Sequence, residues 1–162
     1  MRWFCNSEGK IQTVESLEPG TYRIQDRQLQ DYEGNVWTIV DLLGEKDADG
    51  SQEILDSYVI HTDPLHLWLD DVRPAPEGYD YWALTAQQAL EALQTGCVGH
   101  VSLDHDLGDS DETGYTVATW IEQAVTSKQI PELTWQVHSA NPVGRKRIEQ
   151  ALRNLKRVDR FP

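Results

Sequence analysis

The sequence predicts an α/β fold in which a small antiparallel β-unit precedes a doubly wound parallel sheet. Before residue 62, short segments of strand-forming residues recur, with turn signals between them and no helical period. After residue 63, apolar strands alternate with amphipathic helices, a pattern typical of a parallel sheet. We therefore expect a β-rich unit at 1–62 and an α/β domain at 63–162.

The β-rich unit is predicted from strand-forming segments separated by turn signals such as Pro19-Gly20 and Glu33-Gly34-Asn35. The strands expected from this pattern are residues 2–5, 11–14, 21–24, 36–43 and 57–61. Residues 1–64 contain 13 acidic and 5 basic residues, a net charge of −8. We expect this unit to cover a site or to bind a protein partner.

The α/β domain is predicted from four apolar segments and the helices between them. Thr85 and Gln88 form a capping box at the start of the first helix, which ends at Gly96. A second helix begins at about Gly114, and Asn141 is the N-cap of a third. Right-handed crossovers would place helices on both faces of the sheet and ligands at the carboxyl ends of its strands. The strands are expected at residues 65–69, 79–84, 101–103 and 133–137.

The composition excludes several classes of protein. The net charge is −13, from 14 Lys and Arg against 27 Asp and Glu, so the whole surface should not bind a nucleic-acid backbone. No apolar run reaches the roughly 18 residues of a membrane span, and the start has no apolar signal segment. Cys5 and Cys97 lie far apart, outside any zinc-binding spacing. We therefore expect a cytoplasmic protein with no membrane partner.

Acidic residues follow the strands at the positions where such folds bind ligands. Asp70 and Asp71 come directly after the first strand of the domain, and Asp104 comes directly after the third. If these strands are neighbours, their ends lie about 5 Å apart and the carboxylates repel one another. A divalent cation would remove this repulsion, and oxygen ligands of this kind suit Mg²⁺ or Mn²⁺. For any one aspartate taken singly, a solvated loop is the alternative interpretation.

Residues around the fourth strand indicate phosphate chemistry. His138 and Ser139 stand where this strand leads into a helix whose N-terminus, at Asn141, attracts anions. Arg145 follows in the first turns, within a stretch, 145–160, that contains seven basic residues. His105 and His138 are candidates for acid and base catalysis, in an order that the sequence does not assign. A structural histidine and a solvated basic helix face are the alternatives.

Residues 65–157 resemble the receiver domain of two-component response regulators, which has a flavodoxin-like fold. The segments "LWLDDVRP", "SLDHDLG" and "VHSANPVGRKRI" resemble more closely the group described as cyclic-phosphate processing receiver domains. The resemblance implies that Asp71 and Asp104 bind the metal, with Asp70 assisting and the Asp106 backbone helping. It also implies that Ser139 contacts the phosphate. The position of Asp104 accepts a phosphoryl group in an ordinary receiver.

One departure from the receiver pattern separates the possible functions. An ordinary receiver has a fifth strand that ends in a Lys-Pro pair, and residues 1–162 contain no such pair, so the sheet is expected to be truncated at its last strand. We expect a metal-dependent phosphoesterase that processes a cyclic phosphate, such as the 2′,3′-cyclic end of RNA or a cyclic nucleotide. The alternatives are a phospho-accepting receiver, a non-catalytic sensor of a phosphorylated small molecule, and an acidic inhibitor that mimics nucleic acid.

Overall fold

The chain divides into two compact units, Met1–Asp63 and Pro64–Pro162. The computed structural model describes residues 3–5, 9–13, 20–25, 28–30, 36–38, 57–61, 63–108 and 111–158.

The first unit consists of antiparallel strands, as predicted. Its two-stranded sheet pairs β1 (Trp3–Cys5) with β2 (Ile11–Thr13). Its four-stranded antiparallel sheet has the order β5-β4-β3-β6. The strands of that sheet are β3 (Gly20–Gln25), β4 (Gln28–Gln30), β5 (Val36–Thr38) and β6 (Ser57–Ile60). Residues 2, 14 and 39–43 of the predicted strands lie outside the described residues.

The second unit contains the predicted parallel sheet, which is confirmed. Its strand order is β10-β9-β7-β8, and all three pairings are parallel. This is the flavodoxin-like order, with four strands among the residues that the structure describes. Strand β9 is longer than predicted because it begins three residues earlier. The strands are β7 (Leu65–Leu69), β8 (Tyr81–Ala83), β9 (Val98–Leu103) and β10 (Thr134–Val137).

The helices start at the capping residues that the sequence indicates. In α2 (Ala86–Gln94), the Thr85 hydroxyl accepts from the backbone N–H of Gln88 at 3.2 Å. Gly96 then takes a φ of 74°, which favours glycine after a helix. The other two helices are α3 (Gly114–Thr126) and α4 (Pro142–Ala151).

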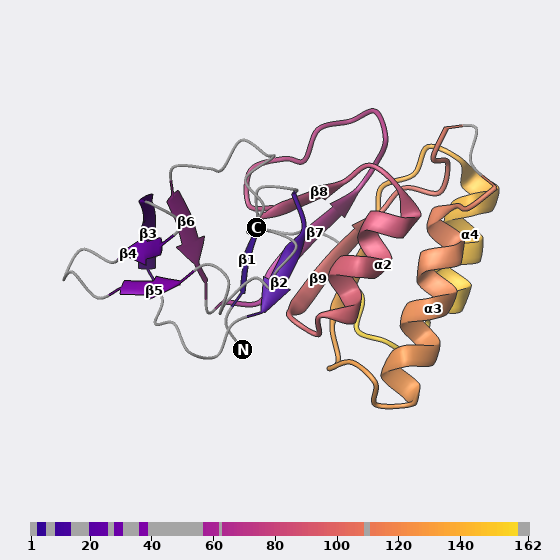
Figure 1. The fold of residues 1–162 in the computed structure, drawn as a ribbon. Coiled ribbons are helices and arrows are strands. Elements are labelled where there is room, and N and C mark those ends of the chain that lie inside the picture. The colour runs from indigo at the N-terminus through magenta and orange to yellow at the C-terminus, as the bar shows by residue number, and fades with distance from the viewer. Residues whose placement is uncertain are drawn as a thin grey trace. The chain divides into compact units, whose positions relative to one another are not determined.

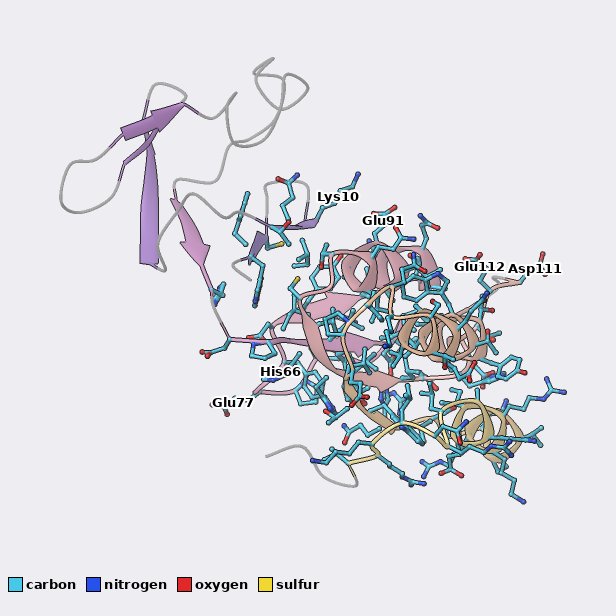
Figure 2. The ribbon with its side chains drawn as sticks, turned by 90° about the horizontal axis from the view of Figure 1, so that it is seen from below. Lys10, His66, Glu77, Glu91, Asp111 and Glu112 are labelled. Carbon is cyan, nitrogen blue, oxygen red and sulfur yellow. The ribbon has the colours of Figure 1, made fainter. Side chains whose placement is uncertain are left out.

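The helices cover one face of the sheet. The steps from β8 to β9 and from β9 to β10 run in the same direction, so right-handed crossovers put α2 and α3 on the same face. Helix α4 packs against α3, and all three lie on one side of the strands (Figures 1 and 2). The step from β7 to β8 runs in the opposite direction, so a helix in that connection would lie on the other face. Residues 70–80 instead form a loop with two prolines. The prediction of helices on both faces is therefore wrong for the described residues.

The core lies between this face of the sheet and the helices. Alternate residues of β7 and β9 point toward the helices and have no exposed surface, because strand side chains alternate between faces. Burial of this kind stabilises the fold by roughly 1.5–3 kcal/mol for each large apolar side chain. The side chains with no exposed surface include Leu65, Leu67, Leu69, Val101, Leu103, Val117, Ile121 and Ile148.

After α4 the chain returns to the edge of the sheet. The backbone N–H of Trp135 donates to the Lys156 carbonyl at 3.1 Å, and that of Val158 donates to the Trp135 carbonyl at 2.8 Å. Arg157 thereby forms a parallel bridge beside β10, at the position of a fifth strand. Residues 159–162 lie outside the described residues.

Candidate active site

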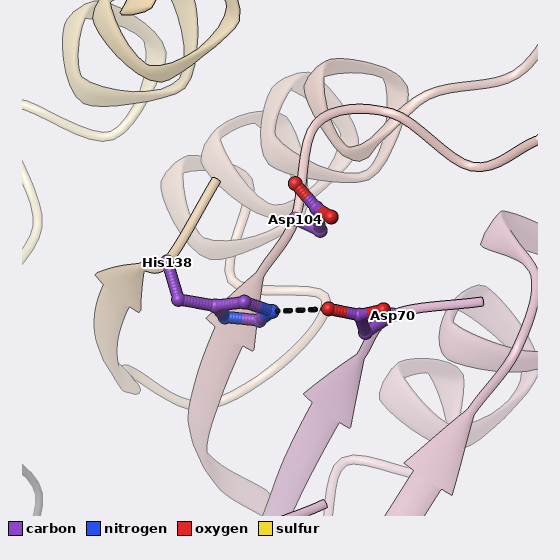
Figure 3. Close-up of side chains that lie close together, drawn as sticks. All are labelled: Asp70, Asp104 and His138. Carbon is purple, nitrogen blue, oxygen red and sulfur yellow. Dashed lines mark hydrogen bonds and ion pairs between the residues drawn. The ribbon is translucent and has the colours of Figure 1, made fainter. Parts of the chain in front are cut away.

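Three side chains that can bind a metal or transfer a proton meet at the carboxyl edge of the parallel sheet. Asp70 follows β7, Asp104 follows β9 and His138 follows β10, and these strands are neighbours. Each residue offers a ligand atom within 4.8 Å of the others. Figure 3 shows the three side chains converging, and we call them the carboxylate–histidine cluster. The topology thus brings together residues that are far apart in the sequence.

Asp70 is fully buried, and both oxygens of its carboxylate are hydrogen-bonded. Oδ1 accepts from the backbone N–H groups of Val72 at 2.9 Å and of Arg73 at 2.6 Å. Oδ2 accepts from Arg73 Nε at 2.6 Å and lies 3.1 Å from His138 Nε2. Burial alone would raise the pKa of Asp70, but the two backbone N–H groups and the Arg73 charge outweigh it and lower that pKa. Asp70 is therefore an ionised carboxylate in a fixed orientation.

The positive charge beside these carboxylates belongs to Arg73, a residue missing from the set predicted from the sequence. Its guanidinium donates to Asp70 through Nε and to Asp104 Oδ2 through Nη2 at 2.6 Å. Nη1 donates to the His138 carbonyl at 3.2 Å. Arg73 therefore occupies the position between the two carboxylates for which the sequence predicts a cation. The sequence contains a signal for this contact, because Arg73 follows Asp70 by three residues in "LDDVRP".

Asp104 is held by the start of the loop that follows β9. It is 8% exposed, and its Oδ1 accepts from the backbone N–H of His105 at 2.7 Å. Helix α3 begins against this backbone, because a Cβ at Gly114 would contact the Asp104 carbonyl. Glycine at the first position of α3 therefore lets the helix approach the site closely.

The His138 ring is half-buried and packs against an aromatic side chain. It stacks on the indole of Trp68, with ring centroids 3.5 Å apart and an interplanar angle of 7°. Its Nδ1 lies 2.6 Å from Ser102 Oγ, and its Nε2 faces Asp70. Burial, helped by the Arg73 charge, lowers the pKa of His138 to about 4 against the opposing effects of Asp70 and Asp104. The ring therefore carries one proton at neutral pH and can donate or accept it.

His105 belongs to a second group of side chains at the start of α4. Its Nδ1 lies 2.7 Å from Asp106 Oδ1, and the side-chain amide of Asn141 donates to both Asp106 oxygens at 3.2 Å. The hydrogen bond from His105 is the main cause of the lowered pKa of Asp106. A Cβ at Gly144 would contact the His105 ring, so the ring packs directly on the backbone of α4.

The three residues predicted to bind phosphate already have partners in the chain. Ser139 is 2% exposed, and its hydroxyl accepts from the backbone N–H of Asn141 at 3.2 Å. The Asn141 side chain caps α4 by accepting from Val143 and Gly144. Arg145 donates to the Ser139 carbonyl through Nη2 at 2.9 Å. These residues organise the turn from β10 into α4, immediately after His138.

Asp71 is the one residue of the Asp70-Asp71 pair that lies outside the carboxylate–histidine cluster. It is half-buried and borders the loop after β9. A Cβ at Gly108 would lie 3.2 Å from Asp71 Oδ2, and Gly108 has a φ of 61°. Of the four residues predicted to bind metal, the structure therefore brings Asp70 and Asp104 together, while Asp71 and Asp106 have other surroundings.

A comparison with known families agrees with this geometry. The sequence model of the cyclic-phosphate processing receiver domain family matches residues 65–154, which is more than half of the chain. The chain belongs to this family. The receiver domain so identified is the second compact unit, and the family's description supports the processing of a cyclic phosphate. The cluster and Arg73 lie within the matched residues.

No curated protein and no solved structure gave a match to this chain. Among the described residues, none of the helices has the length and apolar character needed to cross a bilayer.

Proposed function

We propose that the receiver domain hydrolyses a cyclic phosphodiester with the help of a divalent cation. The substrates proposed are the 2′,3′-cyclic end of RNA and a cyclic nucleotide. In this reaction water adds to phosphorus and one ring P–O bond breaks. The departing oxygen takes a proton, so the products are a phosphomonoester and a free hydroxyl. The site must therefore accept a proton, donate a proton and neutralise the phosphate oxygens.

The observation that supports this proposal is the convergence of two buried carboxylates and a neutral histidine at one edge of the sheet. With Arg73 between them, Asp70 and Asp104 leave a net charge of −1, which repels a phosphate anion. A divalent cation would reverse the sign of this charge. Carboxylate oxygens within 4.8 Å of one another are the hard ligands that Mg²⁺ and Mn²⁺ prefer, so the residues fit such an ion.

Asp70 and Asp104 would hold the cation where the Arg73 guanidinium now lies. The Arg73 side chain is 45% exposed, so it can turn toward solvent without leaving a buried charge. When bound, Mg²⁺ or Mn²⁺ would neutralise the negative charge on a phosphate oxygen. The displaced guanidinium would then be close enough to donate two hydrogen bonds to the substrate phosphate.

The proton transfers are assigned to His138 and His105. His138 lies within the carboxylate–histidine cluster, and His105 follows Asp104 directly. Ser139 and Asn141 keep the α4 end of the site in place. Arg145 would reach a phosphate only by leaving the Ser139 carbonyl, so we assign it a lesser part in binding.

The proposal is tested on the full chain with RNA that carries a 2′,3′-cyclic end and with cyclic nucleotides. Formation of the phosphomonoester is followed in Mg²⁺, Mn²⁺ and EDTA. We expect turnover only with a divalent cation, and a loss of about 100-fold or more in Asp104→Asn. Asp111→Asn is the matched control, because Asp111 is exposed in the same connection and points away from the strands (Figure 2).

Two outcomes would contradict the proposal. Absence of turnover with every cyclic phosphate in Mg²⁺ and Mn²⁺ would rule it out, and so would equal rates in Asp104→Asn and wild type. Intact mass after incubation with a small phosphodonor distinguishes the phospho-accepting alternative. In that case wild type gains one phosphoryl group and Asp104→Asn gains none.

A further inference from the structure

The sheet face opposite the helices carries two rows of polar and aromatic side chains. Residues paired in register sit side by side across β7, β9 and β10, and residues two apart on a strand share a face. In the described part of the chain, every buried side-chain nitrogen or oxygen has a hydrogen-bond partner. The rows are His66–His100–Thr134 and Trp68–Ser102–Gln136.

At one end of these rows, a backbone carbonyl fixes the direction of the hydrogen bonds. The Thr134 hydroxyl lies 3.3 Å from the Gly99 carbonyl, an acceptor only, and 2.8 Å from His100 Nδ1; with its hydrogen on the carbonyl, it accepts from Nδ1. Burial lowers the pKa of His100 to about 4, so the neutral ring has a lone pair on Nε2. The Tyr79 hydroxyl lies 3.3 Å from this Nε2 and therefore donates to it.

At the other end, the Asp70 carboxylate fixes the direction independently. A carboxylate only accepts, so His138 Nε2 donates its hydrogen to Asp70 Oδ2 at 3.1 Å. The other nitrogen of this neutral ring, Nδ1, is then an acceptor. The Ser102 hydroxyl, 2.6 Å from Nδ1, donates to it. The single hydroxyl hydrogen of Ser102 is therefore used in the bond to His138, as that of Tyr79 is used in the bond to His100.

The two chains of hydrogen bonds meet at Gln136. Its Nε2 lies 2.6 Å from Tyr79 Oη and 3.1 Å from Ser102 Oγ. Both hydroxyls have already donated, so each needs a donor, and a side-chain amide has two hydrogens on one nitrogen. We propose that Gln136 is a positioning residue whose two hydrogen bonds fix His138 with its proton on Nε2, directed at Asp70, and His100 with its proton on Nδ1.

This arrangement separates the roles of the two candidate catalytic histidines. With its proton on Nε2, His138 has no lone pair directed at the cluster, so it neither accepts a proton there nor ligates a metal through Nε2. On the proposed function, on which this consequence rests, His138 is not the group that accepts the proton of the attacking water. His105, whose Nδ1 lies 2.7 Å from Asp106 Oδ1, is then the remaining histidine proposed as the acceptor.

The test is a long-range ¹H–¹⁵N correlation spectrum of the ¹⁵N-labelled full chain in EDTA, which reports which ring nitrogen carries the proton. The signals are assigned with His100→Gln and His138→Gln. We expect His138 protonated on Nε2 and His100 protonated on Nδ1 in the same spectrum. A wild-type His138 with its proton on Nδ1, or with protons on both nitrogens at neutral pH, would overturn the proposal whatever the enzymatic activity.

Variants of Gln136 test whether this residue fixes the two histidine tautomers. In Gln136→Glu the new carboxylate accepts from both hydroxyls, so both histidines should move their proton to the opposite nitrogen. Gln136→Met, which keeps the length and adds no charge, should give mixed tautomers and serves if the first variant does not fold. Thr134→Val is the control, because Thr134 contacts His100 and the Gly99 carbonyl and its loss should leave His138 unchanged. Wild-type tautomers in both Gln136 variants would refute the role of this residue.

Discussion

Removal of the Arg73 charge tests the electrostatics of the site directly. In Arg73→Gln, Asp70 and Asp104 lose the cation that donates to both at 2.6 Å. Breaking a buried ion pair costs about 3–5 kcal/mol, but the Arg73 side chain is 45% exposed and solvent screens part of the loss. We therefore expect the free energy of unfolding of the receiver domain to fall by about 2 kcal/mol in EDTA. With a urea dependence of about 2 kcal/mol per molar, the midpoint should fall by about 1 M.

Mg²⁺ should restore most of this loss, because a divalent cation can replace the guanidinium between the carboxylates. Urea unfolding followed by tryptophan fluorescence measures both effects, since Trp68 stacks on His138 within the site. Arg147→Gln, an exposed position on α4, is the matched control and should change stability by less than about 0.5 kcal/mol. Equal midpoints for Arg73→Gln and wild type in EDTA would refute the charge argument. A lower midpoint that Mg²⁺ does not raise would refute the cation site.

Three further predictions concern stability. The pKa of His100 is lowered from 6.5 to about 4, so between these values only the unfolded chain takes up the proton. The free energy of unfolding should therefore fall by about 3 kcal/mol as the pH drops through this window, and His100→Gln should remove this part of the slope in urea titrations at several pH values. Asn141→Ala should lower stability by about 1 kcal/mol in urea unfolding, because it removes the α4 cap; no change would show that the cap is dispensable. Gly144→Ala should lower it by about 1–3 kcal/mol by displacing His105, and a wild-type midpoint would contradict that packing.

The fold of the receiver domain could be predicted because its signals are local. The apolar run at 65–69, the Thr85 cap and the Asn141 cap each depend on residues close together in the sequence. The place of the site could also be predicted, because parallel strands end at one edge and Asp70 and Asp104 follow two of them. These inferences need only strand order and handedness, which a few general rules restrict.

Other features of the site depend on geometry that the sequence does not show. Successive side chains near the end of a strand point in different directions, so a pair of aspartates does not reveal which one enters the cluster. Here Asp70 enters and Asp71 does not. Arg73 was missed because its position depends on the turn that Asp70 forms with the backbone after β7. The Gln136 contacts depend on strand register, which pairs Gln136 with Ser102 only in the folded sheet.

The two carboxylates of the cluster are not equivalent, and this difference suggests where a ligand acts. If Arg73 turns away, Asp70 keeps two backbone N–H groups and His138, whereas Asp104 keeps only the backbone N–H of His105. Oδ2 of Asp104 then has no remaining donor among its described contacts, while both oxygens of Asp70 stay engaged. An incoming cation should therefore draw most of its new bonding from Asp104, with Asp70 as a fixed second ligand. For the same reason, Asp104 is the carboxylate at which a substitution should most strongly reduce cation binding.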